Sequence, residues 1–108
     1  MKPLRFFIST ALDNQDLYLF KEVEKICGSR LELLSQYEKL ALVHIFYCYL
    51  HVSLDIEDYM LTDALFDALQ SAAASKENQK VCQILFLLEK VPRRNILVFA
   101  QFVAGNIA

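Results

Sequence analysis

A chain of 108 residues in which 56% are hydrophobic, with only 2 Gly and 2 Pro, is expected to fold as a single helical domain over residues 1–108. Its net charge of -2 comes from 11 basic and 13 acidic residues mixed along the chain, which excludes an extended basic surface for nucleic acid. No apolar run reaches the ~20 residues that a membrane span needs, so a spanning protein is excluded as well.

The first two elements are predicted to be helices. Pro3 suits the first turn of a short helix that runs to about Leu12. Asp13 or Asn14 can cap a second helix, which is expected to end before a left-handed Gly28. The apolar residues of this second helix recur at helical spacing and form one stripe: Leu19, Phe20, Val23, Ile26 and Cys27.

Two capping boxes follow, at Ser29–Glu32 and at Ser35–Glu38. The second box is predicted to start a long helix that runs to about Val52. The segment Leu40–Leu54 (LALVHIFYCYLHVSL) is apolar on nearly every side, whereas a surface helix keeps a polar face. This helix must therefore be covered by other helices, by a partner chain or by a ligand.

Asp55 is predicted to cap the next helix, which runs to about Ala73. Leu54 and Tyr59 occupy the positions of a hydrophobic staple around this cap. The inward stripe of the helix is expected to contain Leu61, Leu65, Ala68, Leu69 and Ala72.

Ser75 is predicted to cap a further helix, which Pro92 ends because proline has no amide hydrogen to donate. The inward residues of that helix are Val81, Ile84, Leu85 and Leu88. The last helix is expected over about Ile96–Ala104, and Gly105 can stop it.

These elements predict an all-α fold, an antiparallel bundle of four to five helices. Two of the helices, 36–52 and 96–104, lack a proper polar face. One of them can form the centre of the bundle, and the second then lies most simply in an interface between two copies of the chain. We assign this interface to the last helix, through Leu97, Phe99, Phe102 and Val103.

The long helix also carries a polar stripe made of His44, Cys48, His51 and Asp55. All four side-chain types can bind zinc, but only neighbouring members of the stripe are close enough to share an ion. We therefore expect no metal site. The stripe is interpreted as the least apolar side of the helix or as a pH-sensitive interface, and a thiol or metal enzyme remains an alternative.

Each of two charged clusters can be interpreted either as ordinary helix and surface structure or as a binding site. The acidic residues around the fourth helix predict a solvated face or an acidic docking surface: Asp55, Glu57, Asp58, Asp63 and Asp67. The basic turn Lys90, Arg93 and Arg94 suits a helix C-terminus, and it can also clamp a carboxylate or phosphate of a partner.

The long apolar segment shows a family resemblance. Leu34 and Ser35 are followed by Leu40–Val43 and by Tyr47. This pattern resembles a helix in the N-terminal domain of the orange carotenoid protein, which also opens with a capped Leu-Ser and carries Leu-Ala-Leu followed by aromatic residues. The resemblance implies a helical bundle and a photosynthesis-related regulator.

We expect a small helical protein–protein interaction module or regulator that works as a homodimer and binds another protein, with no enzymatic activity and no cofactor. The three scattered cysteines fit reduced thiols and a cytoplasmic location. The alternative function is a helical bundle that binds an apolar small molecule, such as a pigment or lipid, among its aromatic residues. Those residues are Phe46, Tyr47, Tyr49, Phe86, Phe99 and Phe102.

Overall fold

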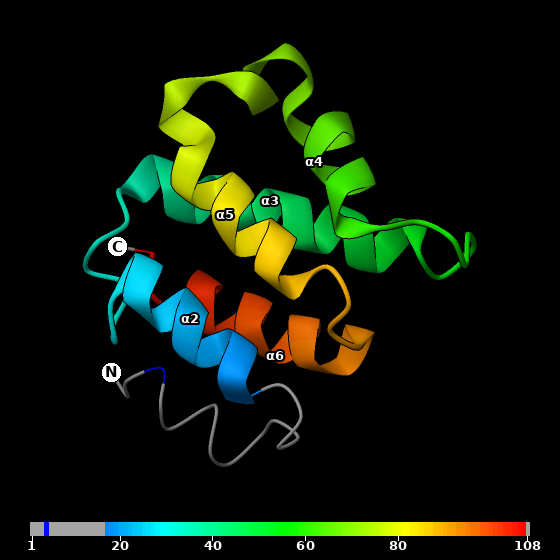
Figure 1. The fold of residues 1–108 in the computed structure, drawn as a ribbon. Coiled ribbons are helices and arrows are strands. Elements are labelled where there is room, and N and C mark those ends of the chain that lie inside the picture. Colours follow the sequence, from blue (N-terminus) through cyan, green and yellow to red (C-terminus); the bar gives the residue numbers. More distant parts are fainter. Residues whose placement is uncertain (1–3, 5–16, 108) are drawn as a thin grey trace.

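The computed structural model describes Leu4 and residues 17–107, and this part of the chain is all-α, as predicted (Figure 1). The α-helices are α2 (Leu17–Cys27), α3 (Gln36–Val52), α4 (Leu61–Leu69), α5 (Gln79–Leu88) and α6 (Arg93–Ala104). Two short 3₁₀ helices, η2 (Gln70–Ala74) and η3 (Lys76–Asn78), connect α4 to α5. Of the helix predicted to end near Leu12, only Leu4 is described, as a helical and buried residue, and the rest lies outside the described residues.

Helix α3 runs through the middle of the molecule, with α4 packed on one side of it and α6 on the other (Figure 1). Helix α5 crosses in front of α3 in this view and packs against α2. Helices α3 and α6 are antiparallel, because Arg93 bonds the Leu50 carbonyl at one end and Lys39 bonds the Asn106 carbonyl at the other. The predicted helical bundle is therefore confirmed.

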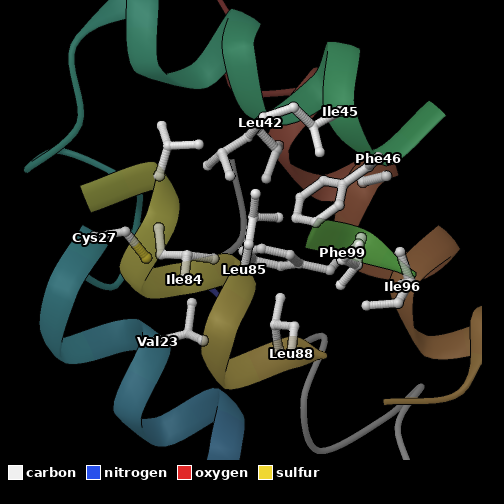
Figure 2. Close-up of a cluster of buried hydrophobic side chains, with 14 of the residues drawn as sticks. Val23, Cys27, Leu42, Ile45, Phe46, Ile84, Leu85, Leu88, Ile96 and Phe99 are labelled. Carbon is white, nitrogen blue, oxygen red and sulfur yellow. The ribbon is translucent and has the colours of Figure 1, made fainter. Parts of the chain in front are cut away.

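The core lies between α3, α5 and α6 and is closed by α2 (Figure 2). The stripe predicted for the fifth helix is confirmed, because all four of its residues are buried: Val81, Ile84, Leu85 and Leu88. The Phe99 ring meets Phe20 and Phe46 edge-to-face, at centroid distances of 5.4 and 5.6 Å. Such pairs add about 0.5–1.5 kcal/mol each to the burial of the rings, so Phe99 links three helices.

The assignment of an interface to the last helix is wrong for three of its four residues. Phe99, Phe102 and Val103 are 2%, 3% and 0% exposed, so they belong to the core of their own chain. Leu97 alone is exposed, at 40%. The prediction failed because the sequence shows how apolar each helix is, whereas the packing of the neighbouring helices decides which one is enclosed.

The first capping box, Ser29–Glu32, begins no helix. Gly28 ends α2 in the left-handed region at φ 84°, as predicted, and Leu31 also has a positive φ of 61°. The Glu32 carboxylate accepts the Arg30 amide at 2.8 Å within this turn. This hydrogen bond between a side chain and the nearby backbone stabilises the connection between α2 and α3.

The second capping box, Ser35–Glu38, is confirmed. The Glu38 amide donates to Ser35 Oγ at 3.1 Å, and the Ser35 amide donates to Glu38 Oε1 at 2.8 Å. Helix α3 then runs to Val52, where it was expected to end. Reciprocal capping fixes the start of the helix that carries most of the surface described below.

The boundaries of the later helices differ from the prediction. Asp55 caps no helix, because turns follow α3 and α4 begins only at Leu61. Asp63 accepts the Met60 amide at 2.9 Å and thereby satisfies a free donor at this start. Gly105 ends α6 at an ordinary φ of -68° and needs no left-handed conformation.

Candidate interaction surface on helix α3

Helix α3 presents an uncharged outer face, which we call the α3 stripe. Its residues follow alternating steps of three and four along the chain and therefore lie on one side of the helix. They are Tyr37, Leu40, His44, Tyr47, His51 and, just after the helix, Leu54. All are exposed, Leu40 by 55% and Leu54 by 69%.

The stripe faces outward because the opposite side of α3 is already used by the core. Ala41, Leu42, Ile45 and Phe46 are buried against α4, α5 and α6. The only Asp, Glu, Lys or Arg residues in α3 are Glu38 and Lys39, at its first turns. The long apolar segment is therefore covered on one side by its own chain and left open on the other.

An open groove of about 510 Å³ continues the stripe towards α6. We call it the α3–α6 groove, and its lining residues are Tyr47, Leu50, His51, Leu54, Arg93, Arg94 and Leu97. Its apolar residues come from both helices, whereas its polar side chains are two guanidinium groups, an imidazole and a phenol. The basic turn predicted from the sequence thus lies beside the stripe.

Arg93 holds the two walls of this groove together. Its Nε donates to Ser53 Oγ at 2.7 Å, and its Nη2 donates to the Leu50 carbonyl at 2.6 Å. A cation at this place is favourable because the carbonyls at a helix C-terminus carry partial negative charge. Arg94 is exposed and makes no hydrogen bond or ion pair with the part of the chain that the structure describes.

The structure does not gather the predicted polar stripe into a site. His44, His51 and Asp55 are exposed to solvent. Cys48 instead lies at the edge of the helix, with its Sγ 3.5 Å from the hydroxyl of Tyr59. Among the described residues, no three Asp, Glu, His or Cys side chains are close enough together to hold a metal ion.

Tyr59 connects α3 to α4 through a polar contact that the sequence did not predict. Its hydroxyl donates to Asp67 Oδ2 at 2.5 Å, and Cys48 lies on its other side. Burial, followed by these hydrogen bonds to Asp67 and Cys48, raises the pKa of Tyr59. The sequence separations are too irregular to signal this contact, because a turn brings the three side chains together.

The remaining predicted clusters are the acidic residues around the fourth helix and the aromatic residues. All five acidic residues around the fourth helix are exposed. The aromatic residues proposed as a ligand pocket are divided between core and surface: Phe46, Phe99 and Phe102 are buried, whereas Tyr47 and Phe86 are exposed. Tyr49 is half-buried, and burial raises its pKa.

Comparison with protein-family models, with curated proteins and with solved structures finds no match to this chain. The resemblance to the carotenoid-binding domain therefore stays a prediction. Within residues 17–107, every helix is too short or too polar to cross a membrane.

Proposed function

We propose that this protein is a small helical interaction module that binds a helical segment of another protein through the α3 stripe. The supporting observation is the exposure of Tyr37, Leu40, Tyr47 and Leu54 along a helix whose outer face carries no charged side chain. Contiguous apolar surface of this kind marks interaction sites, and aromatic residues are enriched in them. A partner helix that lies along α3 would remove these side chains from water.

A second copy of the chain is the other candidate partner. The alternating steps of the stripe correspond to the a and d positions of a coiled coil, with His44 and His51 at one position and Leu40 and Tyr47 at the other. A homodimer of this kind would use α3, whereas the sequence pointed to the last helix. The homodimer would bury the same stripe. It is distinguished from a complex with another protein because the purified chain alone would associate as its concentration rises.

The test uses Leu40→Asp, which places a charge in the stripe, and Phe86→Asp, the same change on the exposed side of α5. Sedimentation equilibrium measures self-association, and pull-down from the native host measures capture of a partner. We expect Leu40→Asp to abolish the association and Phe86→Asp to preserve it, with melting temperatures close to that of the unchanged protein. A monomer that captures nothing, or capture that Leu40→Asp leaves intact, would contradict the proposal.

A further inference from the structure

We infer that the α3–α6 groove binds an acidic amphipathic helix of a partner protein. This inference rests on the proposed function, because the groove includes the C-terminal half of the α3 stripe. Leu50, Leu54 and Leu97 come from both walls and give the groove an apolar surface that is open to solvent. A groove of this form suits a helix that inserts the apolar side chains of one face.

The charge of the groove determines the chemistry of that helix. The charged groups that line it are Arg93 and Arg94, and Lys90 lies in the preceding turn. The chain as a whole carries a net charge of -2, so this basic edge is a local feature. Carboxylates of a partner would form charge-assisted hydrogen bonds here, whereas its cations would be repelled.

Arg93 and Arg94 are prepared for this role in different ways. The hydrogen bonds of Arg93 to Ser53 and Leu50 fix its guanidinium group before any partner arrives. A guanidinium has five N–H donors, so others are left for a carboxylate. Arg94 is exposed and can turn towards the same ligand. Arg93 would therefore orient a bound carboxylate, and the exposed Arg94 would add electrostatic attraction.

A second copy of the chain fits this groove less well. Its own acidic helix is α4, but Leu61, Ala64 and Leu65 of that helix are buried in its own core. Phe66 is the large hydrophobic residue that α4 leaves exposed, so α4 of a second copy cannot offer an apolar face together with its carboxylates. A second open depression on α3, around Tyr37, is lined by Glu38 and Glu77 as well as Lys76, and its mixed charges select neither sign.

The experiment compares two dye-labelled helical peptides of about 18 residues, long enough for five turns. Both carry leucines at helical spacing on one face, and one has glutamates beside them where the other has lysines. Fluorescence anisotropy measures the binding of each peptide to the full chain. We expect the acidic peptide to bind at least about tenfold more tightly, by a margin that falls with added salt.

Three variants locate the binding. Arg94→Glu should weaken the acidic peptide about tenfold and strengthen the basic one, because it reverses a charge on the edge of the groove. Leu54→Asp should reduce the binding of both peptides. Lys21→Glu is the matched control, since it makes the same charge reversal on the exposed side of α2 and should change neither affinity.

Each contrary outcome is informative. Equal affinities for the two peptides, or acidic-peptide binding that Arg94→Glu does not change, would overturn the acidic partner but support the proposed function if Leu54→Asp still abolished binding. Self-association that excludes the peptides would identify a second copy as the occupant and overturn the inference alone. Absence of any binding or self-association would reject both.

Discussion

Cys27 shows how completely burial can set the chemistry of one side chain. It is 0% exposed at the end of α2, and its Sγ contacts the Gly28 carbonyl at 3.5 Å. Desolvation is the main cause that raises the pKa of the Cys27 thiol from 9.0 to about 12. A thiol in this state behaves as a small hydrophobic group and is a poor nucleophile.

The raised pKa predicts a loss of stability at high pH. Between pH 9.0 and about 12 the unfolded chain loses the Cys27 proton and the folded chain keeps it, so the free energy of unfolding falls as the pH rises. The slope from this group approaches about 1.4 kcal/mol per pH unit. Urea unfolding over this range should show a shallower decline for Cys27→Ala, which retains the raised pKa values of Cys82, Tyr49 and Tyr59. An equal decline of the free energy of unfolding with pH in both proteins would contradict a raised pKa of Cys27.

At the scale of the element, the turn after α2 depends on one glycine. Gly28 has φ 84°, and a Cβ built there would lie 2.5 Å from Cδ and Oε1 of Glu32. Hydrogen bonds from its own amide and from that of Arg30 hold the pKa of the Glu32 carboxyl below its ordinary value and keep the side chain over the turn. The left-handed conformation of Gly28 and the position of the Glu32 side chain therefore together set the path of the chain from α2 to α3.

Replacing Gly28 by Ala is expected to destabilise the fold by about 1–2 kcal/mol, because an L-residue is strained in the left-handed region. Gly105→Ala is the matched control. Its φ is -68°, and its nearest contact from a new Cβ would be an ordinary 3.4 Å to the Gln101 carbonyl. We expect that change to stay within about 0.5 kcal/mol of the original stability. Chemical denaturation of both variants measures the difference, and an equal loss at the two glycines would show that the conformation of Gly28 is unimportant.

At the scale of the whole molecule, the two most apolar helices have different roles. Helix α6 inserts Ile96, Phe99 and Val103 into the core, whereas α3 contributes one face to the core and leaves the other exposed. Among the described helices, α3 has the most exposed large hydrophobic residues, which are Tyr37, Leu40 and Tyr47. An interface through Phe99, Phe102 and Val103 would require the fold to open.

This division predicts losses of stability of very different size for two substitutions in α6. Phe102→Asp should remove about 3–5 kcal/mol or more and unfold the chain, because a carboxylate would replace a ring that is 3% exposed. Leu97→Asp should cost less than about 1 kcal/mol, since Leu97 is 40% exposed. Circular dichroism melting distinguishes them, and a folded Phe102→Asp protein that only loses assembly would restore the original assignment.

The candidate surface was predictable in part. The sequence identified the apolar long helix, the basic turn at Arg93 and Arg94 and the side of the long helix that carries His44 and His51. It assigned an interface to Phe99, Phe102 and Val103, which are buried in the core, because apolar helices have similar sequence patterns until their neighbours are known. The α3–α6 groove escaped prediction, since Leu54 and Leu97 are brought together only by the antiparallel packing of α3 on α6.

The sequence by itself determined the local structure: helical class, the capping of α3 by Ser35 and Glu38, the glycine stop after α2 and the inward stripe of α5. These features depend on side chains within a few residues of each other, so a short stretch of sequence is enough to predict them. Only the tertiary structure decided that Ser29–Glu32 forms a turn, that α6 is enclosed and that α3 stays open. Those outcomes depend on contacts between distant segments, where burial of a whole helix face outweighs the preference of any short motif.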